Sequence, residues 1–288
     1  MIPESFEYFA PTSVQEAVSL AQRHGEEAKF LSGGHSLLPM MKLRLATPKF
    51  VIDLGGIREL TQITEEGGKF RIGALVNHHT LESSEKIRGR CRLLAQTAAQ
   101  IGDPQVRNCG TLGGSVSHAD PAADYPAALL ALEVEMEVEG PGGRRRISAA
   151  DFFVDLFTSA LKPSELLVAV HVPVLESNVG SAYKKLRQQA SGFAIVGAAA
   201  IVAKDEGGKC QRVAIGITGV GPKAFRATAA EKALLGKSLT EKNIEKACHQ
   251  IASGIDVQGD IHASSDYRRA MADVFARRAV LAAAGLSQ

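Results

Sequence analysis

Apolar residues in the first 54 positions follow a helical pattern and then two strand patterns. Val14, Ala17, Val18 and Ala21 recur at helical spacing behind a capping box that begins at Ser13, which predicts a helix that ends near His24-Gly25. Short apolar runs predict strands at 28–31 and 50–54, and a short amphipathic helix is expected at 37–45, before Pro48. Residues 1–54 therefore form a first unit with a small α/β fold.

A second unit is expected over residues 55–175. Alternation of Val134, Met136 and Val138 with acidic residues predicts a strand with one face in water. The other elements expected are strands at 70–75 and 166–172, helices at 81–87 and 90–101, and a short apolar helix that opens at 121–126. The polar stretch 176–178 follows this unit and predicts a domain boundary.

The remainder, residues 176–288, divides into strands followed by helices. Strands are expected at 183–186, 194–203 and 213–218, and helices at 228–235, 240–253 and 266–284. Strands that precede helices in this way predict an α+β domain whose helices cover one face of a sheet.

Charge and composition narrow the function classes. With 33 basic and 31 acidic residues the net charge is +2, which argues against a nucleic-acid or anionic-membrane partner. The one dense basic run, Arg144 to Arg146, follows a glycine-rich turn and is interpreted as a solvated strand. No run of 18 apolar residues and no secretory leader is visible, so we expect a protein without a transmembrane segment.

The four cysteines, Cys91, Cys109, Cys210 and Cys248, are scattered along the chain. They form no C-x-x-C pair, which is typical of a reducing cytoplasm. Their spacing also excludes an iron–sulfur cluster built within this chain, because such clusters need closely grouped thiolates. Any such centre must belong to another polypeptide.

Two glycine pairs, Gly33-Gly34 and Gly113-Gly114, are the most informative feature of the sequence. Each follows an apolar segment, and each is followed by a small polar or imidazole side chain. Glycine allows backbone N–H groups to converge on an anion and allows a ligand to approach the main chain. Either pair alone is first a turn signal. The two together predict two turns that hold the diphosphate of a large cofactor between two parts of the fold.

Other polar residues near these pairs leave alternatives open. His35 and His118 could donate to a phosphate or lie near a bound ring, or could be ordinary surface histidines. Asp124 could accept hydrogen bonds from ribose hydroxyls or could cap the following helix, and Asp120 is open to the same readings. The adjacent His78 and His79 point different ways and make a poor metal site. Dinucleotide-binding G-x-G-x-x-G, P-loop and hydrolase-elbow signatures are absent.

The segments 32–44 and 111–124 together resemble the FAD-binding medium subunits of molybdenum hydroxylases, the family that includes the medium subunit of aerobic carbon monoxide dehydrogenase and the FAD-binding subunit of xanthine dehydrogenase. The resemblance extends over nearly the whole chain. It implies a fold of the vanillyl-alcohol-oxidase (PCMH) type, with two α/β FAD-binding subdomains over 1–54 and 55–175. A C-terminal domain over 176–288, with a three-stranded sheet and a helical bundle, is implied as well.

The resemblance also implies which residues bind FAD. The backbone of Ser32–Ser36 and of Thr111–Ser115 would hold the diphosphate, Lys29 and Leu31 would lie beside the adenosine, and Asp124 would take ribitol or ribose hydroxyls. Phe193 would cover the flavin ring near its reactive nitrogen, where relatives often have Tyr or an aliphatic residue. The full implied set is Lys29, Leu31, Ser32, Gly33, Gly34, His35, Ser36, Leu37, Thr111, Gly113, Gly114, Ser115, His118, Ala123, Asp124, Leu161, Lys184 and Phe193. No residue is expected to be catalytic or to bind a metal.

By the same resemblance, this chain takes electrons onto FAD from 2Fe–2S clusters of a small subunit, while a large subunit holds a molybdenum–pterin cofactor and oxidises the substrate. The flavin would pass the electrons to an external acceptor, and the assembly would be a dimer of heterotrimers. The complex is expected in the cytoplasm, where it could associate peripherally with a membrane. Two alternatives remain open: a self-contained flavin oxidase or reductase of this fold, with His35 as a point of covalent attachment, or a non-redox nucleotide-binding protein.

Overall fold

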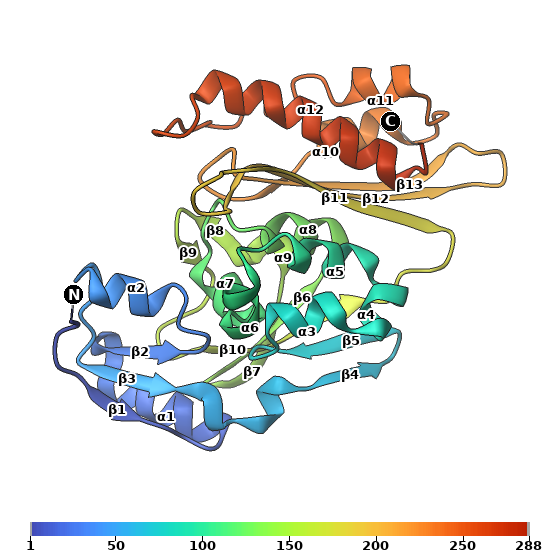
Figure 1. The fold of residues 1–288 in the computed structure, drawn as a ribbon. Helices are drawn as coiled ribbons and strands as arrows, with labels where there is room; N and C mark the ends of the chain where they lie inside the picture. The colour runs from blue at the N-terminus through green and yellow to red at the C-terminus, as the bar shows by residue number, and fades with distance from the viewer. Residues whose placement is uncertain (1, 287–288) are drawn as a thin grey trace.

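The computed structural model describes residues 2–286 and shows two parts stacked on one another (Figure 1). The lower part carries the N-terminal subdomains, and the upper part is a sheet covered by C-terminal helices. The α+β fold of PCMH type expected from the resemblance is confirmed. No helix in residues 2–286 is long and apolar enough to cross a lipid bilayer.

The first unit is a parallel three-stranded sheet of order β1-β3-β2. Ser13 caps the first helix through its hydroxyl, and the buried stripe of Val14, Ala17, Val18 and Ala21 packs against the sheet, as the sequence predicts. The elements are β1 (Glu7–Phe9), α1 (Val14–His24), β2 (Ala28–Leu31), α2 (Leu37–Lys42) and β3 (Phe50–Asp53), with a short 3-10 turn at Gly25–Glu27. Two further 3-10 turns, Leu54–Gly56 and Arg58–Thr61, lead into the second unit.

The second unit is an antiparallel five-stranded sheet of order β4-β5-β10-β6-β7, with helices on one face. Its strands are β4 (Ile63–Glu66), β5 (Lys69–Gly73), β6 (Glu135–Gly140), β7 (Gly143–Ser148) and β10 (Leu166–Pro173). Its helices are α3 (His78–Ser83), α4 (Glu85–Arg90), α5 (Arg92–Ala99), α6 (Pro104–Cys109), α7 (Leu112–His118), α8 (Tyr125–Leu132) and α9 (Ala149–Phe152), and a small hairpin joins β8 (Phe153–Asp155) to β9 (Thr158–Ser159). All eight residues of α8 are buried.

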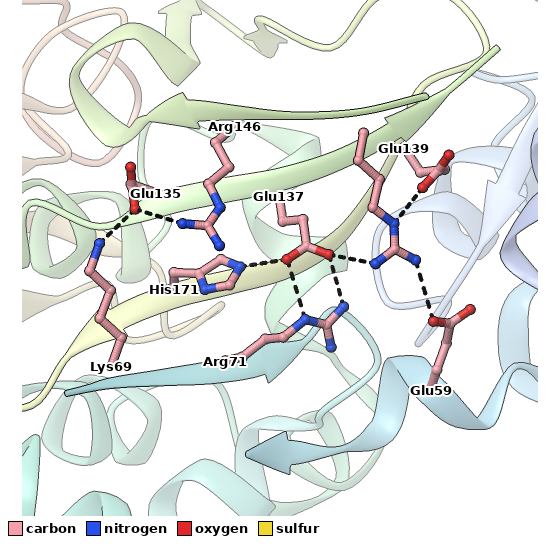
Figure 2. A network of polar contacts seen from close by, with 9 residues as sticks. Glu59, Lys69, Arg71, Glu135, Glu137, Glu139, Arg146 and His171 are labelled. Atoms are coloured by element: carbon pink, nitrogen blue, oxygen red, sulfur yellow. Dashed lines mark hydrogen bonds and ion pairs between the residues drawn. The ribbon is translucent and has the colours of Figure 1, made fainter. Parts of the chain in front are cut away.

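The other face of this sheet packs on α1 at one end and also carries a network of ion pairs (Figure 2). At its centre Glu137 accepts hydrogen bonds from Arg71, Arg144 and His171. Burial alone would raise the pKa of Glu137, but the hydrogen bonds from Arg71 and His171 hold that pKa at about 2. The run Arg144 to Arg146 forms strand β7, as predicted, and each of the three pairs with a glutamate. The basic run is thus balanced by acids within the chain.

The C-terminal part is an antiparallel sheet of order β11-β12-β13-β14 that lies between two helical layers. Its elements are β11 (Val179–Arg187), β12 (Ala194–Lys204), β13 (Cys210–Thr218), β14 (Phe225–Arg226), α10 (Thr228–Leu234), α11 (Glu241–Ala247) and α12 (Ser265–Ala283). One face packs on α8 and α5, the other on α12. The expected three-stranded sheet thus gains a fourth strand, β14, whose two residues are too few to show a period of two.

Small residues bring this sheet close to the neighbouring helices. A Cβ on Gly216 would lie 2.0 Å from the carbonyl oxygen of Ala127 in α8. Glycine is therefore required where β13 crosses α8. The boundaries proposed at residues 54 and 175 separate the three larger sheets along the chain, and they stay predictions.

Candidate functional site

A cavity of about 770 Å³ lies where the three units meet. Its wall is built from the α2 region of the first unit, from α6, α7 and the β8–β9 hairpin of the second, and from Ser191 to Phe193, which follow β11. This volume is in the range of sites that enclose a large organic ligand. Apolar side chains line much of the wall, together with hydroxyl, imidazole and carboxylate groups.

The two glycine segments lie side by side in this wall. The hydroxyls of Ser32 and Thr111 are 2.7 Å apart and hydrogen-bonded, which joins the segments directly. A Cβ on Gly33 would lie 2.1 Å from the carbonyl oxygen of Cys109, so only glycine allows this approach. The sequence places these segments about 80 residues apart, and the fold brings them together.

The first glycine segment is an open loop with free donors. Gly34 has φ +72°, a left-handed conformation that favours glycine. Among the described residues, no acceptor is hydrogen-bonded to the backbone N–H groups of Gly33 to Ser36. Consecutive unpaired N–H groups next to a cavity are what binding of a diphosphate requires.

The second glycine segment differs from the predicted tight turn. Thr111 caps helix α7, so Gly113 and Gly114 lie in the first helical turn. The N–H groups of Gly113, Gly114 and Ser115 donate to the Ala74 carbonyl, the Thr111 hydroxyl and the Thr111 carbonyl, respectively. This segment can therefore contribute close approach and hydroxyl groups, while free amide donors come from the first segment.

Most of the residues expected to bind a cofactor line this one cavity. All of the eighteen do so except Leu31 and Lys184. Leu31 ends β2, directly before the first glycine segment. Lys184 is exposed on β11, whereas its neighbour Lys185 reaches toward the cavity wall and pairs with Asp124. The fold thus brings together a site whose residues are spread from position 29 to position 193.

Asp124 lies in the cavity wall and also contacts the C-terminal part. Its carboxylate accepts hydrogen bonds from the Tyr183 hydroxyl (2.5 Å) and the Lys185 ammonium (2.7 Å). Burial raises the pKa of Asp124 and lowers the pKa of Lys185, although the attraction between the two acts the other way. Asp124 occupies the N-cap position of α8, but its side chain makes no capping hydrogen bond, so the capping alternative is wrong.

Further residues outside the expected set also line the cavity, among them His78, Asp120 and Phe157. One oxygen of Asp120 accepts from the Ala122 N–H, and burial raises the pKa of this carboxyl. Phe157 has φ +50° at the tip of the β8–β9 hairpin, and its ring lies 5.2 Å from that of His118. The position of Asp120 beside Pro121 makes it a candidate site residue in the sequence. Phe157 can be recognised as a cavity residue only from its tertiary contacts.

His78 is a buried histidine whose Nδ1 lies 3.0 Å from the Tyr125 hydroxyl. Burial lowers the pKa of His78 to about 4, with smaller contributions from the positive charges of His35 and Arg107. It is therefore neutral at pH 7. In residues 2–286, no three His, Cys, Asp or Glu side chains are grouped closely enough to hold a metal ion.

This lowered pKa predicts a pH dependence of stability. The unfolded chain takes up a proton on His78 below about pH 6.5, while the folded chain does so only near pH 4. The contribution of His78 to the free energy of unfolding is therefore fully present above pH 6.5 and decreases as the pH falls, by about 2 kcal/mol between pH 7 and pH 5. Urea unfolding of the wild type and of His78→Gln at both pH values measures this. A wild-type loss no larger than that of the variant would contradict the assignment.

Comparison with known proteins identifies the same two-part organisation. Residues 4–175 match the family described as FAD binding domain in molybdopterin dehydrogenase, and residues 181–283 match the CO dehydrogenase flavoprotein C-terminal domain. The sequence is 41% identical over 283 residues to the carbon monoxide dehydrogenase medium chain of Hydrogenophaga pseudoflava, with 98% of each chain covered. It is 37% identical to the 6-hydroxypseudooxynicotine dehydrogenase complex subunit alpha of Paenarthrobacter nicotinovorans, with 93% of this chain and 90% of the relative covered.

The fold is similar to solved structures over its full length. A carbon monoxide dehydrogenase from Hydrogenophaga pseudoflava, which lacks the Mo-pyranopterin moiety of the molybdenum cofactor, superposes with a TM-score of 0.96 at 42% identity. The match covers 100% of both chains. Quinoline 2-oxidoreductase from Pseudomonas putida superposes with a TM-score of 0.93 at 31% identity, with 99% of each chain covered.

Proposed function

The chain belongs to the family of FAD-binding medium subunits of molybdenum hydroxylases of the carbon monoxide and xanthine dehydrogenase type, and from that premise we propose that it transfers electrons between 2Fe–2S clusters of a partner subunit and an external acceptor. FAD is its cofactor, and the relatives are subunits of oxidoreductase complexes. The observation that carries the proposal is the pair of glycine segments hydrogen-bonded to each other in the wall of one cavity.

The residues of the cavity offer groups suited to each part of FAD. The free N–H groups of Gly33 to Ser36 would donate to the diphosphate, and the Ser115 hydroxyl would add a donor from α7. Asp120 and Asp124 would accept hydrogen bonds from ribityl or ribose hydroxyls. The aromatic rings of Phe157 and Phe193 line the cavity and would cover apolar ring surface.

When bound, FAD supplies a redox centre that can take up electrons one at a time and release them singly or in pairs. This chain would bind it, exclude water from it and dock it near the electron donor. Its four cysteines are all free and separate, so the 2Fe–2S clusters would belong to a small partner subunit. The molybdenum–pterin cofactor would belong to a large partner subunit, within a dimer of heterotrimers.

Substrate oxidation would then occur on the large subunit. The relatives named above serve enzymes for carbon monoxide and for 6-hydroxypseudooxynicotine, although each is at least 37% identical to this chain. Relatives that match this chain over nearly their full length are named for dehydrogenases of very different substrates, which favours a role that all of them share over the selection of one substrate. This supports a role in cofactor binding and electron transfer.

Copurification with the partner subunits tests the proposal. We expect the untagged complex to contain molybdenum and iron beside FAD, and its flavin absorbance near 450 nm to be bleached by the enzyme's substrate. The isolated chain, loaded with FAD, should be bleached by dithionite but not by that substrate. Substrate turnover by the isolated chain would instead support a self-contained oxidase or reductase, as would flavin that stays on the denatured chain. Protein that ignores added FAD would support a non-redox nucleotide-binding role.

A further inference from the structure

The cavity wall includes the loop between α7 and α8. Asp120, Ala123 and Asp124 of this loop face the cavity. Within its own unit the loop makes only short-range bonds, in which the carbonyl and carboxylate oxygens of Asp120 accept from Ala123 N–H (3.0 Å) and Ala122 N–H (2.8 Å). These bonds shape a turn but do not fix it against the rest of the site.

The C-terminal part supplies donors to the backbone of this loop. The carbonyl of Pro121 accepts from Gly219 N–H at 2.8 Å, and the carbonyl of Ala122 accepts from Ala194 N–H at 3.2 Å. The hydroxyl of Thr218 lies 2.8 Å from the carbonyl oxygens of both Pro121 and Ala123 and is shared between them. Three consecutive carbonyls are therefore held from the opposite side of the domain boundary.

The side chain of the next residue, Asp124, is held in the same way. Tyr183 and Lys185, which point to the same face of β11, donate to its two carboxylate oxygens. The Lys185 side chain is only 1% exposed and also donates to the Gln100 carbonyl at 3.0 Å. These contacts are buried, where hydrogen bonds to a charged group are strong and costly to lose.

None of Thr218, Tyr183 and Lys185 lines the cavity. Their contribution to the site must therefore pass through the loop. We propose that these three residues are positioning residues that set the affinity for FAD by holding residues 121–124 in the shape that the cofactor meets. Since linkage is reciprocal, FAD bound to the loop stabilises the docking of the C-terminal part by the same free energy. This inference rests on the proposed function, because it assumes FAD in this cavity.

Thr218 offers the cleanest test. Thr218→Val keeps the shape of the side chain and removes the shared donor, while Thr218→Ser keeps the donor. With the full-length apoprotein titrated with FAD and followed by flavin fluorescence, we expect Thr218→Val to raise the Kd about tenfold, the effect of losing one buried hydrogen bond. Thr218→Ser should stay near the wild-type value.

The adjacent lysines of β11 give a matched pair of variants. Lys185→Met should raise the Kd for FAD at least as much as Thr218→Val, because it removes the cation held against Asp124. Lys184→Met makes the same chemical change on the exposed side of the same strand and should leave the Kd unchanged. A raised Kd in Lys184→Met together with a wild-type Kd in Lys185→Met would overturn the proposal.

Limited proteolysis measures the reciprocal effect, in which bound FAD stabilises the docking of the C-terminal part. Glu176 lies in the exposed connection between the two parts, so a glutamate-specific protease can report their undocking. FAD should slow cleavage there in the wild type and slow it less in Thr218→Val and Lys185→Met. Variants that melt at lower temperature but keep the wild-type Kd and the wild-type protection would show a merely structural role and would overturn the inference. A wild-type chain that binds no FAD would overturn the proposed function together with it.

Discussion

Replacing Gly33 with alanine should abolish FAD binding, with a Kd at least about 100-fold above the wild-type value. The added Cβ would lie 2.1 Å from the carbonyl oxygen of Cys109 and 2.8 Å from the Cα of Gly110. Both are backbone atoms, so no side-chain rotation relieves the clash. The two glycine segments must separate, which breaks the Ser32–Thr111 hydrogen bond and spreads the N–H donors that would hold the diphosphate.

Equilibrium dialysis of the apoprotein with FAD measures this effect. Gly89→Ala is a suitable control, because a Cβ at Gly89 in α4 would meet nothing within 4 Å and its φ is not positive. This control should bind FAD normally and fold at least as well as the wild type. Normal FAD content in Gly33→Ala would show that the segments do not act together on one ligand.

Replacing Asp124 with alanine should lower the free energy of unfolding of the apoprotein by about 3 kcal/mol. The substitution leaves the ammonium group of Lys185 buried with a single carbonyl partner, and it removes the acceptor of the Tyr183 hydroxyl. FAD binding should weaken too, since the loop that faces the cofactor loses its side-chain anchor. Chemical denaturation without FAD separates the stability effect from the binding effect.

A double-mutant cycle isolates the ion pair from other effects of the substitution. Asp124→Ala combined with Lys185→Met removes both charges, so the double variant should be more stable than the sum of the two single losses predicts. Strictly additive losses would mean that Asp124 and Lys185 stabilise the fold independently, and the pair would then not hold the two parts together.

The spacing of apolar residues predicted helices and strands well where the pattern continues over a long segment. The helix that starts behind Ser13 and the strands of the C-terminal sheet lie where their apolar spacing places them. At the second glycine pair the sequence predicts a tight turn, because Gly-Gly is a strong local turn signal, and the structure differs. Thr111 caps a helix there instead. Thr111 is part of the local sequence, but the bond from the Gly113 N–H to the Ala74 carbonyl is a long-range contact that the local sequence does not show.

Site residues that belong to a sequence motif could be predicted. Residues whose role depends on which way a side chain points from its strand were harder to predict. Two adjacent lysines, Lys184 and Lys185, look alike in the sequence, yet successive residues of a strand point to opposite faces. Which of them reaches Asp124 depends on how β11 sits over α8, a contact between residues about 60 positions apart. Phe157 lacks any sequence signal, because its place beside His118 arises from the hairpin's position over α7.

The close crossing of β13 over α8 restricts how related chains can be recombined. A chimera joined in the connection at 176–178 would take α8 from one parent and the sheet above it from another. Since Gly216 must face the Ala127 carbonyl without a side chain between them, a donor sheet with any larger residue there would be held away from the helix. Functional chimeras should therefore inherit α8 and β13 from the same parent.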